Sequence, residues 1–195
     1  MRKFLVIMIA VVALMACSAM AQDLGCKGKM MGSAYASYAF GMGDAFKGVT
    51  TKHIEISQDA GIGFGGMFHY GVTEQIFVGG ELGVQSYKAK SKYTGPANPA
   101  ASALNFDDSS MKINFLANCL YAINYTDDAD AFFVTAGAGL YGGFDDIGLN
   151  GGIVYRKMVS PSVGVFFMPR FHFLFSDPSA MMVQIAAGVS LPLGN

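Results

Sequence analysis

Alternation of apolar residues with polar or small ones, repeated along almost the whole chain, most limits what this sequence can fold into. Between residues 111 and 124, Met111, Ile113 and Phe115 begin an apolar series, while Lys112 and Asn114 begin the intervening one. This period of two is typical of strands whose two faces meet different surroundings. The sequence predicts eight strands, at about Ser33–Gly43, Glu55–Tyr70, Gln75–Tyr87, Ser110–Tyr125, Ala131–Gly143, Ile147–Met158, Val163–Phe175 and Ala180–Leu193.

Composition indicates where such strands can lie. The chain is 52% hydrophobic and 14% charged, whereas soluble domains carry about 25% charged residues. After the first 21 residues, no apolar run approaches the ~20 residues of a membrane helix. A closed barrel is the non-helical way to satisfy backbone groups in lipid. We therefore expect an all-β fold, an eight-stranded antiparallel up-and-down transmembrane β-barrel. A soluble exported barrel that binds a small apolar molecule is an alternative, because its sheets alternate too.

The N-terminus has the pattern of an export signal. Arg2 and Lys3 precede the apolar run Phe4–Ala16, and Ala19-Met20-Ala21 forms a small-x-small cleavage site. We expect residues 1–21 to be a cleaved signal peptide and residues 22–195 to form the barrel domain. An alternative is the lipoprotein-like sequence Leu14–Cys17, which would make a lipidated Cys17 the mature N-terminus.

Short and long connections between the predicted strands alternate, which predicts the topology. Outer-membrane barrels have short periplasmic turns and longer outer loops. With both termini periplasmic, Lys88–Ser109, the longest connection, lies outside and is a candidate contact for an extracellular ligand. The tight turns are Gly71–Glu74, Thr126–Asp130 and Val159–Ser162; the others are Asp44–Ile54, Lys88–Ser109, Phe144–Asp146 and Ser176–Ser179.

These features resemble the small eight-stranded outer-membrane β-barrel family of the OmpA/OmpX type, often described as porin-like. The signal ending Ala19–Ala21, the repeated strands and the Gly-rich stretch Phe133–Tyr141 carry the resemblance, which covers nearly the whole mature chain. It implies a bacterial outer-membrane location, contact with outer-membrane lipid and handling by the barrel assembly machinery. It also implies a network of charged side chains inside the barrel.

Ionised side chains indicate which face of each strand lines the lumen, because a charge that faces lipid is costly. Glu81 and Arg170 lie near the middle of predicted strands that stand opposite each other in a ring of eight, so we expect them to pair across the lumen. Gln184 or Lys112 are alternative partners. An eight-stranded barrel is about filled by its side chains, which predicts a largely plugged lumen. The lumen-facing polar candidates are Glu81, Lys112, Arg156, Arg170, His172 and Gln184.

No catalytic, cofactor or metal motif is present in the sequence. The three histidines have no close metal-ligand spacing, and His69 is expected in the lumen with His172. The run Gly61–Gly66 lacks the Lys-Ser/Thr of a phosphate loop, and we interpret its inner glycines as space for larger side chains. Tyrosines near strand ends suggest a girdle at the membrane boundary: Tyr70, Tyr87, Tyr121, Tyr125 and Tyr155.

The predicted function is a non-enzymatic outer-membrane barrel with a structural or surface-contact role. A narrow porin-like channel is the main alternative, and a lipid-modifying outer-membrane enzyme is a further one. A formal net charge of −1, or −3 once Arg2 and Lys3 are removed, suggests no nucleic-acid partner. The oligomeric state and the ligand do not follow from the sequence.

Overall fold

Nine strands make up the regular structure in the described part of the chain. The computed structural model describes residues 25–42, 54–59, 61–93, 95, 106–125, 130–142, 145–176 and 180–193; for 54–59, 88–90, 92 and 106–108 it describes the backbone. The strands are β1 Met30–Met42, β2 Ile54–Asp59, β3 Gly61–Gly71, β4 Ile76–Tyr93, β5 Phe106–Asn124, β6 Ala131–Tyr141, β7 Asp146–Ser160, β8 Val163–Leu174 and β9 Ala180–Pro192.

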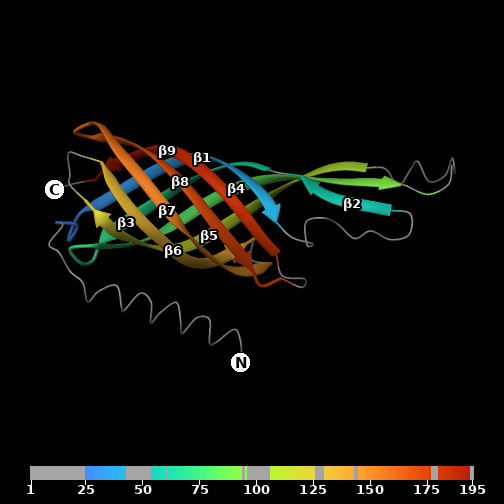
Figure 1. The fold of residues 1–195 in the computed structure, drawn as a ribbon, viewed down its shortest axis with the longest axis horizontal. Coiled ribbons are helices and arrows are strands. Elements are labelled where there is room, and N and C mark those ends of the chain that lie inside the picture. Colours follow the sequence, from blue (N-terminus) through green and yellow to red (C-terminus); the bar gives the residue numbers. More distant parts are fainter. Residues whose placement is uncertain are drawn as a thin grey trace, which may run out of the picture.

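These strands close into one antiparallel barrel. From β3 to β9 each strand pairs with the next one in the chain, so β4 pairs directly with β5 (Figure 1). β1 pairs with β3 and β9, and β2 pairs with β4. Because β2 continues the line of β3 along β4, the ring contains eight strands, as the sequence predicts. Closure pairs the backbone donors and acceptors of every barrel strand on both sides, which is the condition for crossing a bilayer with strands.

The predicted second strand, Glu55–Tyr70, is divided. Asp59 of β2 pairs with Lys88, and Gly63 of β3 pairs with Gln85. Between these two pairs, the segment that joins β2 to β3 has one residue more than β4. Such an extra residue is a β-bulge. At Gly61 an added Cβ would lie 1.7 Å from the Ser86 carbonyl oxygen, so only glycine permits this approach of the two strands.

The prediction that Lys88–Ser109 is a loop without strand structure is wrong for much of its length. β4 continues to Tyr93 and β5 begins at Phe106, and both project beyond the barrel together with β2 (Figure 1). We call β2 and the paired ends of β4 and β5 the extension. It lies at the end opposite the start of β1 and the finish of β9. The register places a lysine opposite an acid three times, at Lys88↔Asp59, Lys92↔Glu55 and Lys90↔Asp107.

Large apolar side chains cover the outside of the barrel. Exposed fractions reach 71% at Ile62 and 67% at Met111, and residues of this kind occur on every barrel strand. Soluble proteins rarely expose contiguous apolar surface beyond a few hundred Å². The outward face therefore matches lipid. No helix in the described ranges is long and apolar enough to cross a membrane.

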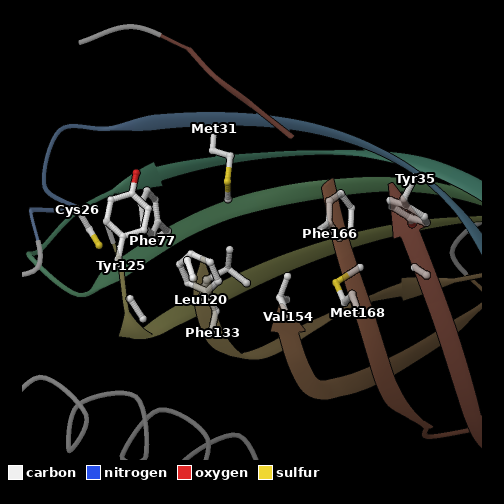
Figure 2. Packing of buried hydrophobic residues seen from close by; sticks show 13 residues of the cluster. Cys26, Met31, Tyr35, Phe77, Leu120, Tyr125, Phe133, Val154, Phe166 and Met168 are labelled. Carbon is white, nitrogen blue, oxygen red and sulfur yellow. The ribbon is translucent and has the colours of Figure 1, made fainter. Parts of the chain in front are cut away.

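The end of the barrel nearest the start of β1 is plugged by aromatic and aliphatic side chains. Residues 25–29 fold over this end, where the Gly28 amide donates to the Gly71 carbonyl at 2.8 Å and Cys26 is fully buried. Phe77, Tyr125 and Phe133 pack as a trio with ring centroids 5.5–6.1 Å apart (Figure 2). These side chains fill the barrel at that end, where each is at most 7% exposed.

Two tyrosines of the predicted girdle face the other way. Tyr125 belongs to the plug and is 7% exposed, and Tyr87 is 8% exposed and donates to the Met182 sulfur at 2.8 Å inside the barrel. Tyr70 does face outward, at 45% exposure, while Tyr121 and Tyr155 are half-buried. Nearness to a strand end does not determine whether a tyrosine faces lipid or the lumen, because successive side chains of a strand point to opposite faces.

Glycines of β3 make room for the side chains that fill the lumen. A Cβ at Gly65 would lie 2.5 Å from the Tyr35 hydroxyl and 2.7 Å from the Leu82 carbonyl oxygen. A Cβ at Gly63 would lie 2.3 Å from the Gln85 side-chain oxygen. The inner glycines of Gly61–Gly66 are therefore space for larger neighbours, as the sequence suggests.

We predict that Gly65→Ala lowers the free energy of unfolding by about 1–3 kcal/mol, because the new methyl group overpacks the lumen. Gly66→Ala is the matched control: its Cβ would meet nothing closer than 3.6 Å, and it should change stability by less than about 0.5 kcal/mol. Urea unfolding in detergent, followed by far-UV circular dichroism, measures both, since the chain has no tryptophan. Equal costs would contradict this account of β3.

Candidate functional site

The Glu81 carboxylate is the centre of the polar lumen. Arg170 donates to it from both terminal nitrogens, from Nη1 to Oε2 at 2.5 Å and from Nη2 to Oε1 at 2.6 Å. The Tyr35 hydroxyl donates to Oε1 at 2.5 Å, and the Asn118 amide donates to Oε2 at 2.7 Å. Each carboxylate oxygen thus accepts two hydrogen bonds. Such charge-assisted, bidentate contacts are among the strongest in proteins.

A second layer of side chains holds the guanidinium. Arg170 Nη2 also donates to the Gln184 side-chain oxygen at 2.7 Å. Because that oxygen is an acceptor, His172 donates to it from Nε2 at 3.1 Å and accepts from the Tyr141 hydroxyl at Nδ1, at 2.8 Å. The geometry therefore places a proton on Nε2 of the His172 ring.

The network continues around the barrel wall. Gln184 donates to the Ser37 hydroxyl at 3.1 Å, and Ser37 donates to Gln85 at 3.1 Å. On the other side, Asn150 donates to Asn118 at 3.1 Å. Side chains from β1, β4, β5, β6, β7, β8 and β9 take part, so the network connects strands that are not neighbours in the sheet.

The six lumen-facing candidates do not all meet. Glu81, Arg170, His172 and Gln184 form the network, and each is at most 6% exposed. Lys112 lies instead toward the extension, where it pairs with Asp145 at 3.7 Å with its side chain 44% exposed. Arg156 is buried on the plug side of the network, against the Tyr125 and Phe133 rings.

Several network members were not singled out from the sequence. Tyr35, Ser37, Asn118 and Tyr141 are uncharged, so the rule that charge selects the lumen did not identify them. Parity could have done so, because Asn118 shares its alternating series with Lys112 and Ser37 shares one with Tyr35.

The Glu81–Arg170 pair is enclosed by the barrel. The carboxylate oxygens and both terminal nitrogens of the guanidinium have hydrogen-bond partners, and both side chains are nearly inaccessible, at 2% and 1% exposure. Layers of buried residues lie on either side, with the plug at one end and Tyr87, Met182, Leu116 and Leu174 toward the other. Within the described ranges, no three His, Cys, Asp or Glu residues gather as a metal site.

Comparison with known proteins supports the fold. No protein-family model and no curated protein matches the sequence. The outer membrane protein OprG of Pseudomonas aeruginosa aligns with a TM-score of 0.53 and 10% identity over 87% of this chain and 97% of that one. A de novo designed transmembrane β-barrel aligns with a TM-score of 0.50 and 11% identity over 86% and 97%. The chain has the fold of small outer-membrane β-barrels, and the predicted fold class is confirmed.

We predict that Glu81→Gln and Arg170→Met each cost about 3–5 kcal/mol of stability, because each leaves a buried charge without its partner. The double variant should cost clearly less than the sum, with a coupling of about 1–3 kcal/mol. Lys112→Met is the control and should cost under about 1 kcal/mol, since its ion pair is exposed. Urea unfolding of the four proteins gives the cycle; additive costs would show that the two charges do not stabilise each other.

Proposed function

We propose that this protein is a bacterial outer-membrane barrel that is closed to diffusion and acts through surface contact made by its extension. The observation that carries the proposal is the contrast between the two ends of β4 and β5. Inside the barrel their inward-facing side chains help to fill the lumen, and beyond it the same strands remain paired and continue outward.

The length of these strands supports an exposed extension. β4 has 18 residues and β5 has 19, whereas a membrane-spanning strand needs about 9–11. The additional residues lie at the end of the barrel opposite the start of β1 and the finish of β9 (Figure 1). With periplasmic termini, as the resemblance implies, this is the extracellular end. The backbone of β4 is paired there with both β2 and β5, which makes the extension a three-stranded sheet.

The filled lumen argues against the porin-like alternative. Four large side chains are each at most 1% exposed: Phe77, Phe133 and Met168 in the cluster that includes the plug, and Arg170 in the network. An eight-stranded barrel has little room beyond its own side chains. The proposal includes no catalytic role, because the lumen's hydrogen-bonded groups face neither lipid nor water.

We predict that the purified barrel gives no ion-current steps in planar lipid bilayers, because the buried layers leave no continuous water path. A diffusion porin reconstituted in the same way shows that current can be detected. Reproducible conductance from the unmodified chain would contradict a closed lumen and favour the porin-like alternative.

We predict that an epitope tag inserted between Ala100 and Ala101 is labelled by antibody on intact cells. The same tag in the Thr126–Asp130 turn is the matched control and should be labelled only after permeabilisation. The reverse pattern would place the extension in the periplasm and remove the basis for surface contact.

The contact role itself is tested by trimming the extension. Tyr87 and Ser110 are register partners, so an Asn-Gly turn can join them in place of residues 88–109. The trimmed barrel should assemble normally but lose most of the retention of cells on protein- or glycan-coated plates. Retention equal to that of the complete chain would contradict the proposed role.

A further inference from the structure

A small cavity lies inside the barrel between the plug and the Glu81–Arg170 network. Its volume is about 20 Å³, and its apolar wall includes Met31, Phe133 and Phe166. A site needs about 10–15 Å³ to hold one water molecule, so there is room for a single water or a monoatomic ion. Three polar side chains complete the wall, namely His69, Arg156 and Ser190.

Polar atoms of these three side chains have no hydrogen-bond partner among the described residues. They are both ring nitrogens of His69, the Nε and Nη2 of Arg156, and the hydroxyl of Ser190. The residues are 1%, 3% and 1% exposed, so bulk water does not satisfy them. Arg156 Nη1 has only a 3.5 Å contact with the Met31 sulfur, a weak acceptor. Buried polar groups are almost always paired, so these unpartnered donors and acceptors around one cavity indicate a binding site.

Charge decides which occupant suits the cavity. Among the described buried side chains, Glu81 is the acid and Arg156 and Arg170 are the arginines. Glu81 is already held by Arg170, which leaves Arg156 with no counter-charge. The Tyr125 and Phe133 rings, 5.0 and 5.8 Å from its guanidinium, attract a cation but carry no charge themselves. An uncompensated buried charge is costly, and a water molecule cannot neutralise it.

We propose that this cavity binds one small monoatomic anion of the halide class, such as chloride. Arg156 supplies the charge and two N–H donors, His69 a ring N–H, and Ser190 its hydroxyl. The apolar wall provides the low dielectric that strengthens these contacts. The anion balances the charge of the lumen and joins β3, β7 and β9 through a shared ligand.

The test combines diffraction with unfolding. Crystals of the unmodified barrel grown in sodium bromide should show an anomalous bromide peak beside Arg156. In solution, replacing gluconate by 0.5 M chloride at constant ionic strength should lower the unfolding equilibrium constant about tenfold, as a single site with a Kd near one tenth of that concentration requires. Gluconate is too large for the cavity and serves as the reference anion.

Variants separate this site from general salt effects. Arg156→Met should abolish the chloride response, and Arg156→Lys should reduce it. Lys112→Met, which removes an exposed cation elsewhere, should leave the response unchanged. A bromide-grown crystal with no anomalous peak in the cavity would overturn the proposal in favour of water, and so would an equal chloride response in the Arg156→Met barrel.

Discussion

Closure of the hydrogen-bonded ring is the constraint on which the rest of this structure depends. Once β1 pairs with β9 and β4 with β5, no barrel strand has a free edge, and each side chain must face either the outside or a narrow interior. The outside takes the large apolar residues. The interior has no bulk solvent, so every polar group placed there needs a partner within the barrel. The Glu81 carboxylate meets this demand with four donors.

The glycines of β3 and of other strands leave the space that the side chains of the network occupy. Tyr35 reaches Glu81 because Gly65 and Gly83 carry no side chain where its ring passes. Gly152 plays the same part for Arg170, since a Cβ there would lie 2.2 Å from the Pro169 carbonyl and 2.9 Å from the Arg170 Cα. A large side chain on one strand lies against a glycine on a neighbouring strand, so the residues that fill the lumen depend on one another across strands.

Alternation and charge were sufficient to predict the barrel and its central pair. The alternation of period two places Glu81 and Arg170 on the inner face, and the strand count places their strands opposite each other in the ring. Their contact could therefore be predicted from the sequence pattern alone. The extension was missed because strands outside a membrane need no apolar series. Lys88, Lys90 and Lys92 alternate with Ala89 and Ser91, and this segment has none of the large apolar residues that marked the other strands. Its pairing depends on β2 and β5, which a local pattern cannot reveal.

The positions of the two arginines show what sequence patterns leave undetermined. Arg156 and Arg170 both belong to inward-facing series, and parity alone treats them alike. Height along the barrel distinguishes them: Arg170 lies level with Glu81, while Arg156 lies beside the aromatic plug, where the neighbouring strands provide rings, a thioether and a hydroxyl. Strand tilt and stagger determine that height, and they are properties of the closed ring. One buried pair is therefore neutral, while the second buried arginine has no acidic partner among the described side chains.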